Sequence, residues 1–194
     1  MIDPEAKCMV KSVDQCVVLP YGQKQGQVTT WLTIGGRVKM EYNRVIEKVK
    51  EAGGKYVVLS GESNRFPEMR DIAQGLASIG YSVVINLGQS DSVEPFRALR
   101  MVRCILHITP PSENINEVNY KNLPLLKEDD DLFINIMNTE ELVRAVDFIT
   151  SVQITRPTIT LNFIRAAGIT EEDRAIISKI SDTKKIRISF IPAE

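Results

Sequence analysis

A small polar cluster, Ser60, Gly61 and Glu62, directly follows the apolar segment at residues 56–59. The segment is short and rich in β-branched residues, as expected of a strand that is buried on both faces. Pro67 then stands where a helix can begin, because the first turn of a helix needs no N–H at that position. The cluster therefore lies between a strand end and a helix, where parallel α/β proteins bind ligands. An ordinary turn with solvated polar residues explains the same pattern.

Glu62 supplies the carboxylate of this cluster and could bind an amine group of a ligand. No histidine or second carboxylate stands near it to complete an acid/base pair. His107 lies inside an apolar segment, and we interpret it as a core histidine, with Cys104 as a small core hydrophobe. The sequence contains no nucleophilic serine motif, phosphate loop or dinucleotide-binding fingerprint.

Strand-like and helix-like segments alternate roughly every 25 residues, which is typical of a parallel sheet with helical crossovers. β-Branched and aromatic segments predict strands at residues 28–34, 56–59, 82–87, 104–108, 132–136, 158–161 and 186–191. Apolar residues at helical spacing predict helices that begin near residues 39, 67, 138 and 170, a helix at residues 93–101, and a short one within residues 114–127.

The ends of several helices are marked in the sequence. Gly53 and Gly80 are expected to end the first two helices. Capping boxes are predicted at residues 138–141 and 170–173, with Asn138 as the first N-cap. The expected buried stripes are Tyr42, Val45, Ile46 and Val49, then Met69, Ile72, Leu76 and Ile79, then Leu142, Val146 and Ile149.

This alternation predicts an α/β fold with mostly parallel strands, either an incomplete TIM-type barrel or an open doubly wound sheet. We favour the incomplete barrel with six or seven βα units, because seven strands are too few for a closed barrel of eight. No linker or change of composition interrupts the chain, so residues 1–194 are predicted to form one domain.

If the strands are parallel, their C-terminal ends bring polar residues to one rim. Asparagine recurs there at three strand ends, and its side chain can read a heterocycle or a ribose because it both donates and accepts. Asparagine is also a common residue where strands end, so each one alone is a weak indication. The predicted ligand-binding residues are Ser60, Gly61, Glu62, Asn86, Gly88, Thr109, Asn135 and Asn162.

The bulk composition excludes several classes of function. Lys and Arg number 24 against 25 Asp and Glu, for a net charge of -1, so no basic surface for nucleic acid is indicated. No apolar run approaches the ~20 residues of a membrane span, and the N-terminus lacks the pattern of a signal peptide. We therefore expect a cytoplasmic protein without nucleic-acid or membrane partners.

The three cysteines, Cys8, Cys16 and Cys104, are scattered and odd in number, which argues against a disulfide framework. Metal sites use close pairs such as Cys-x-x-Cys, and none is present. With one histidine in the chain, a zinc site is not expected either. No residue is therefore predicted to bind a metal ion.

Taken together, the segments resemble the radical S-adenosylmethionine superfamily, most closely its 7-carboxy-7-deazaguanine synthase and activase branch of short incomplete barrels. Residues 29–36, TTWLTIGG, are similar to the first barrel strand of that branch. Residues 59–63, LSGES, stand where the family has Thr-Gly-Gly-Glu-Pro, which holds the amino group of the methionine moiety. The further similar segments, in the same order as in the family, are residues 80–88, 109–112, 119–126, 133–136 and 139–142.

One part of the family pattern is missing. The family binds a [4Fe–4S] cluster through three cysteines spaced Cys-x3-Cys-x2-Cys just after the first strand. Here Gly36 is followed at once by Arg37-Val-Lys-Met40, so that loop is absent. Thiolates are the ligands that such a cluster requires. The resemblance therefore implies a relative without the cluster, in which radical chemistry by this chain alone is not expected.

The sequence thus predicts a pseudoenzyme that keeps the barrel and binds a nucleotide-like or amino-acid-like small molecule, or regulates or scaffolds a partner. No resident cofactor is expected, and S-adenosylmethionine would bind weakly at best. A non-radical enzyme that uses Glu62 as acid or base is one alternative, and a purely structural interaction protein is another. A homodimer or a complex with another protein is compatible with the sequence, which leaves ligand and partner open.

Overall fold

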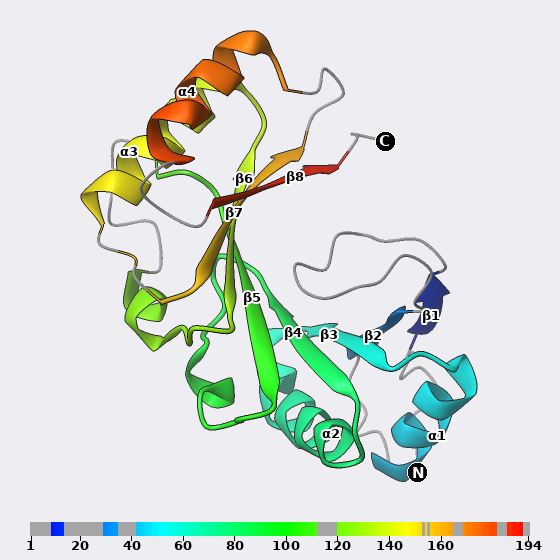
Figure 1. Ribbon diagram of the computed structural model, residues 1–194. Coiled ribbons are helices and arrows are strands. Elements are labelled where there is room, and N and C mark those ends of the chain that lie inside the picture. Colours follow the sequence, from blue (N-terminus) through cyan, green and yellow to red (C-terminus); the bar gives the residue numbers. More distant parts are fainter. Residues whose placement is uncertain are drawn as a thin grey trace. The chain divides into compact units, whose positions relative to one another are not determined.

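The computed structural model describes residues 9–13, 29–34, 42–111, 120–152, 154, 156–164, 169–181 and 186–191. The chain divides into two compact units (Figure 1). Unit 1 comprises Met1–Leu87 and Ser92–Cys104, and unit 2 comprises Gly88–Asp91 and Ile105–Glu194. We describe each unit by itself, and the single domain expected from the sequence stays a prediction.

Strands and helices alternate in the described residues, as the sequence predicts (Figure 1). The strands are β1 Met9–Val13, β2 Thr29–Ile34, β3 Tyr56–Gly61, β4 Ser82–Leu87, β5 Val102–Ile108, β6 Asp131–Ile136, β7 Thr158–Ile164 and β8 Ile186–Ile191. The α-helices are α1 Tyr42–Ala52, α2 Phe66–Ser78, α3 Thr139–Ser151 and α4 Glu171–Ser181, and the 3₁₀-helices are η1 Ser63–Arg65, η2 Glu94–Phe96 and η4 Tyr120–Leu125. None of these helices is long and apolar enough to span a membrane.

The sheet of unit 1 is built on strands that pair in parallel. β2 pairs with β3, and β3 with β4, so that Leu32, Leu59 and Ile85 lie in one row and are each fully buried. The parallel pairing expected from residue 28 onward is confirmed for these pairs. β1 is antiparallel to β2, and its five residues carry no clear strand pattern in the sequence. The apolar run at residues 16–19 lies outside the described residues.

α2 begins and ends as its sequence predicts. Pro67 occupies the first turn, where no N–H is needed. At the other end Gly80 has φ +88° and its N–H donates to the carbonyl of Ala77, while the N–H of Tyr81 donates to that of Leu76. These two bonds form a Schellman motif, which requires the left-handed conformation that glycine adopts without strain.

Three helical expectations in unit 1 are wrong. Tyr42 is 41% exposed and does not belong to the buried stripe of α1, because it is the first residue of that helix. Ile79 is 47% exposed and does not belong to the buried stripe, because it is the C-cap of α2 and lies beyond the last helical turn. Residues 93–101 form only the short η2 instead of a helix of nine residues. The buried residues there, Val93, Phe96 and Leu99, recur every three positions, which fits a 3₁₀ turn better than an α-helix.

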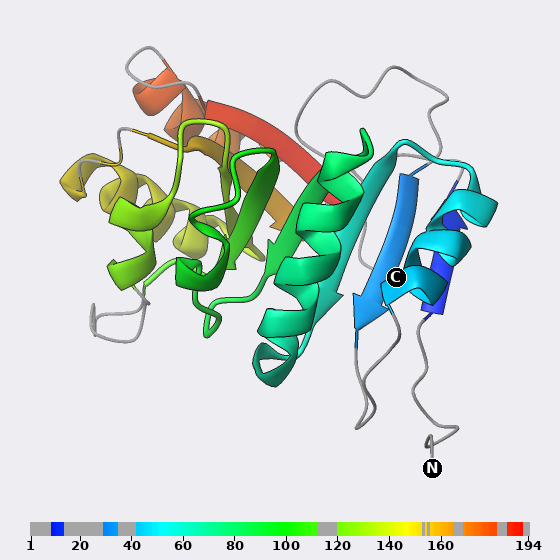
Figure 2. The same cartoon turned by 90° about the horizontal axis from the view of Figure 1, so that it is seen from below.

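The sheet of unit 2 is also parallel. β5 pairs with β6, β6 with β7 and β7 with β8, which confirms the expected direction of these strands. α3 and α4 lie side by side in both views (Figures 1 and 2). The buried apolar residues of α3 include Leu142 and Ile149 as predicted, together with Phe148, whereas Val146 is half-buried. The short helix expected within residues 114–127 is η4, of the 3₁₀ type.

Both predicted capping boxes are present in unit 2, but that of α3 differs in one bond, because Glu141 reaches back to the N–H of Met137, one residue before the N-cap. Asn138 Oδ1 accepts from the N–H of Glu141 at 2.9 Å, and Glu141 Oε2 accepts from the N–H of Met137 at 2.7 Å. At α4, Thr170 Oγ1 accepts from the N–H of Asp173, and Asp173 Oδ2 accepts from the N–H of Thr170. The bonds from the N–H groups of Glu141, Asp173 and Thr170 satisfy donors that a helix start leaves without intrahelical partners.

The first prediction concerns the N-cap of α3. Replacing Asn138 by Ala removes the acceptor for the N–H of Glu141 and should lower the free energy of unfolding by about 1 kcal/mol. Urea denaturation followed by circular dichroism measures the change. Asn138→Ser keeps a capping oxygen and is the matched control, expected within a few tenths of a kcal/mol of the wild type. Equal losses in both variants would contradict a capping role.

Candidate functional site

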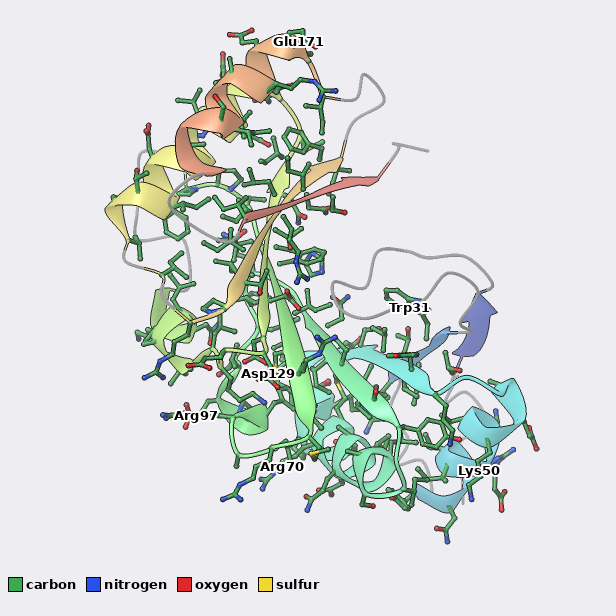
Figure 3. The ribbon with its side chains drawn as sticks, in the orientation of Figure 1. Trp31, Lys50, Arg70, Arg97, Asp129 and Glu171 are labelled. Atoms are coloured by element: carbon green, nitrogen blue, oxygen red, sulfur yellow. The ribbon has the colours of Figure 1, made fainter. Side chains whose placement is uncertain are left out.

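Unit 1 carries a polar row at the C-terminal end of its parallel strands. Thr33 Oγ1 and Ser60 Oγ lie 3.1 Å apart in a hydrogen bond between β2 and β3. Asn86 follows Ile85, the register partner of Leu59, and so stands at the level of Ser60. In Figure 3, Trp31 lies on the side of β2 away from α1 and α2, and Thr33, two residues on, shares that face. The row of Thr33, Ser60 and Asn86 therefore extends this helix-free face.

Gly61 is required by the neighbouring strand. A Cβ at this position would collide with the carbonyl oxygen of Ile34 and would stand 3.0 Å from Met69 Sδ. The close contact at Gly61 is thus one between β2 and β3, in which Gly61 pairs in register with Ile34. Glu62 follows as an exposed residue at the N-cap of η1, where its side chain makes no capping hydrogen bond.

Two of the predicted site residues in unit 2, Gly88 and Thr109, serve the structure of a loop. The N–H of Gly88 donates to Asp91 Oδ2 at 2.7 Å. The N–H and Oγ1 of Thr109 both donate to Gln89 Oε1, at 3.2 and 2.7 Å. Asn122 Nδ2 holds the same loop through the carbonyl of Asp91 at 2.6 Å. The donors of Thr109 are therefore occupied within the protein.

A second polar row crosses β6, β7 and β8 in unit 2. Asn135 pairs in register with Asn162, and Asn162 with Ser189. Asn162 Nδ2 donates to Asn135 Oδ1 at 2.8 Å. Asn162 is 1% exposed and Ser189 3%, so two of the three residues are buried. We call these three residues the amide row.

The amide row contains polar atoms that no described residue satisfies. Asn162 Oδ1 and Ser189 Oγ are buried and have no hydrogen-bond partner among the described residues. Thr160 Oγ1, two residues before Asn162 on the same face of β7, is buried and unpartnered in the same sense. Asn135 and Asn162 are predicted from the sequence, whereas Thr160 and Ser189 are not, because their small hydroxyl side chains look like those of ordinary strand residues.

His107 borders this row. Its side chain is hydrogen-bonded to Asn135, and its ring lies edge-on against Phe133 with centroids 5.0 Å apart. Burial lowers the pKa of His107 below its usual 6.5, and the hydrogen bond to Asn135 offsets only part of that effect. The imidazole is therefore neutral at pH 7, although the side chain is half-buried and not fully in the core. Groups of this kind recognise hydrogen-bond donors and acceptors without formal charge.

The described residues do not fit an iron–sulfur cluster. Cys104 is 1% exposed within β5, as expected of a core residue, and Cys8 and Cys16 lie outside the described residues. Across the described part of the chain, no group of three or more His, Cys, Asp or Glu side chains could hold a metal ion. A [4Fe–4S] cluster requires several converging thiolates.

The predicted site residues fall into separate groups. Ser60, Gly61, Glu62 and Asn86 belong to unit 1, where Ser60 and Asn86 end neighbouring strands. In unit 2 the loop of Gly88 and Thr109 forms one group, and Asn135 with Asn162 forms another. Gly35 and Gly36, which follow β2 in the sequence, and Arg165, which follows β7, lie outside the described residues.

Comparison with known proteins shows a likeness of fold. No family model matches the chain. No curated protein matches it in sequence either. The crystal structure of QueE from Escherichia coli is similar, with a TM-score of 0.62 at 12% identity over 94% of this chain and 91% of that one. The chain thus has an α/β fold in which parallel strands alternate with helices, similar to the partial TIM-type barrel fold of QueE, as predicted.

The second prediction tests why position 61 is a glycine. Gly61→Ala places a methyl group against the carbonyl of Ile34 and should lower the free energy of unfolding by about 1–3 kcal/mol. Gly88→Ala is the matched control at the end of the next strand, since its nearest contact would be an ordinary 3.4 Å to Asp91 Oδ2. Urea denaturation of both variants measures the two changes in the free energy of unfolding. A loss at Gly88 as large as that at Gly61 would contradict the steric explanation.

The third prediction concerns pH. The unfolded chain takes up a proton at His107 near pH 6.5, whereas the folded protein resists it because its pKa is lowered. The free energy of unfolding should therefore fall as the pH drops from above 6.5 toward the folded-state pKa. The chain has one histidine, so the imidazole signals in an NMR titration of untagged protein belong to His107. In His107→Gln this part of the pH dependence should vanish; its persistence would contradict the assignment.

Proposed function

We propose that this chain is a cluster-less relative of the radical S-adenosylmethionine enzymes that binds a small nucleotide-like or amino-acid-like molecule. The likeness in fold to QueE, a 7-carboxy-7-deazaguanine synthase, supports the relationship. The order of the similar sequence segments supports it as well. The absent cysteine loop and the buried position of Cys104 argue against radical chemistry by this chain.

The observation that carries the proposal is the amide row. An unsatisfied polar group buried in a protein costs about 1–3 kcal/mol. Here Asn162 Oδ1, Ser189 Oγ and Thr160 Oγ1 lie close together in one sheet and lack partners among the described residues. A bound molecule with hydrogen-bond donors would recover that cost. Structural sheets usually place apolar side chains at such positions.

In unit 1, Glu62 offers a separate means of recognition. Its exposed carboxylate is not used to cap η1, and it follows the segment that resembles the amine-binding loop of the family. A charge-assisted hydrogen bond to an ammonium group suits this position. Because the family also anchors the methionine moiety through its cluster iron, S-adenosylmethionine itself should bind weakly here.

The fourth prediction is a ligand screen. Adenosyl compounds, deazapurines and pterins should include a molecule that raises the midpoint of thermal unfolding; at 100 times its Kd a ligand adds roughly 2.7 kcal/mol of stability. Iron and sulfide analysis after anaerobic reconstitution accompanies the screen, since about four irons per chain would contradict the cluster-less assignment.

Calorimetry on Glu62→Gln then tests the amine contact. Binding of an amine-bearing hit should weaken by about 1.5–3 kcal/mol while stability changes little, because the substitution keeps the shape and removes the charge. Glu47→Gln, a change of an exposed carboxylate on α1, is the matched control. Equal affinity in both variants would remove Glu62 from the proposal. Turnover of a hit that is lost in Glu62→Gln would instead favour a non-radical enzyme, and a screen without any hit would favour a structural or scaffolding role.

A further inference from the structure

The amide row is an incomplete ladder of side-chain amides. In a parallel sheet, residues in register lie about 4.8 Å apart on the same face, so identical amides can hydrogen-bond from strand to strand. Asn135 and Asn162 form such a step between β6 and β7, with a bond of 2.8 Å. The next position in register, on β8, is Ser189, whose side chain has no amide.

The open end of this ladder is the carbonyl of Asn162. The Nδ2 atom points to Asn135 on β6, and therefore Oδ1, on the other arm of the same planar group, points away from β6. That oxygen is buried and has no partner among the described residues. Ser189 Oγ and Thr160 Oγ1 are buried beside it without partners in the same part of the chain, and each hydroxyl can donate as well as accept.

The uncharged side chains at the open end of the ladder disfavour a charged group of a ligand. Asn162, Ser189 and Thr160 carry no formal charge, and the same face of β5–β8 also bears Asp131 and Arg187, which both have interactions within the protein. An ammonium or carboxylate placed against the neutral groups would have to compete with the existing interactions of Asp131 or Arg187 for a counter-charge, and burying a charge without one is costly. A group that donates one hydrogen bond and accepts another meets no such penalty.

We propose that the amide row is a subsite for a neutral amide group of a bound small molecule, an N–H beside a C=O. The N–H donates to Asn162 Oδ1 and continues the ladder as its third amide, and the hydroxyl of Ser189 or Thr160 donates to the carbonyl. Asn135, at the β6 end of the amide row, and the neighbouring His107 are only half-buried, so this end of the row is the more accessible one. This inference deepens the proposed function and rests on it, since it names the chemical group that the ligand presents.

Nicotinamide and nicotinate are the test pair, because they have nearly the same shape and differ in the neutral amide against the carboxylate. The imidazole of His107 is the probe, since it is the one histidine and is hydrogen-bonded to Asn135. We expect nicotinamide to shift the His107 NMR signals of the untagged protein in a saturable way, and nicotinate to bind at least about tenfold more weakly. Equal effects of the two compounds, or no effect of nicotinamide, would overturn the inference.

Two variants of one residue sharpen the test. Ser189→Asn supplies the third amide from the protein itself and should abolish the response to nicotinamide, whereas Ser189→Ala leaves that position open and should weaken it by about tenfold at most. Unchanged binding in Ser189→Asn would overturn the inference. Should Ser189→Asn not fold, Asn162→Ser removes the acceptor; a response kept there would overturn it equally. A hit in the wider screen combined with no response to nicotinamide leaves the proposed function standing and removes only the amide subsite.

Discussion

The parallel register of the strands is the constraint on which the polar interior of this protein depends. In such a sheet a side chain meets the residue at the same level on the next strand, so a polar residue can find a hydrogen-bond partner at that level where the neighbouring side chain is polar too. Thr33 with Ser60 in unit 1, and Asn135 with Asn162 in unit 2, meet this condition by hydrogen bonds across neighbouring strands. A shift of one residue along any of these strands would place an apolar side chain, or for Thr33 in one direction Gly61, opposite each of them.

The helices that follow β6 and β7 are joined at their starts by a buried carboxylate. Asp173 is fully buried, and it accepts hydrogen bonds both from the N–H of Thr170 at the start of α4 and from Thr139 Oγ1 at the start of α3. One carboxylate thus joins two helix starts, each of which follows a strand of the amide row. The helix dipoles favour a negative charge there. The amide row is consequently supported by helix starts whose relative position within unit 2 is fixed.

The sequence predicts elements whose signals are local. The bounds of β4 and β8 agree with the expected strands, and both capping boxes form, because a cap or a β-branched run is decided within a few residues. Residues 93–101 are predicted as a helix, but the buried residues Val93, Phe96 and Leu99 recur every three positions, and Phe96 packs edge-on against Phe66. The candidate site is harder to predict, because Ser189 and Thr160 can be recognised as site residues only from the register that places them beside Asn162 and its neighbours. Conversely, Thr109 stands at a strand end, where a ligand-binding residue is expected, but its two donors already form hydrogen bonds with Gln89.

The contact between the beginnings of β3 and β4 bears on the order of folding. Lys55 lies over the ring of Tyr81 at 4.9 Å, and its carbonyl accepts from the N–H of Ser82 at 2.9 Å, next to the glycine that ends α2. These contacts close a segment of fewer than 30 residues, so forming them costs little chain entropy compared with pairing distant strands. The β3–α2–β4 segment is therefore expected to acquire native structure early, and pulse-labelling hydrogen exchange would reveal late protection of its amides if it does not.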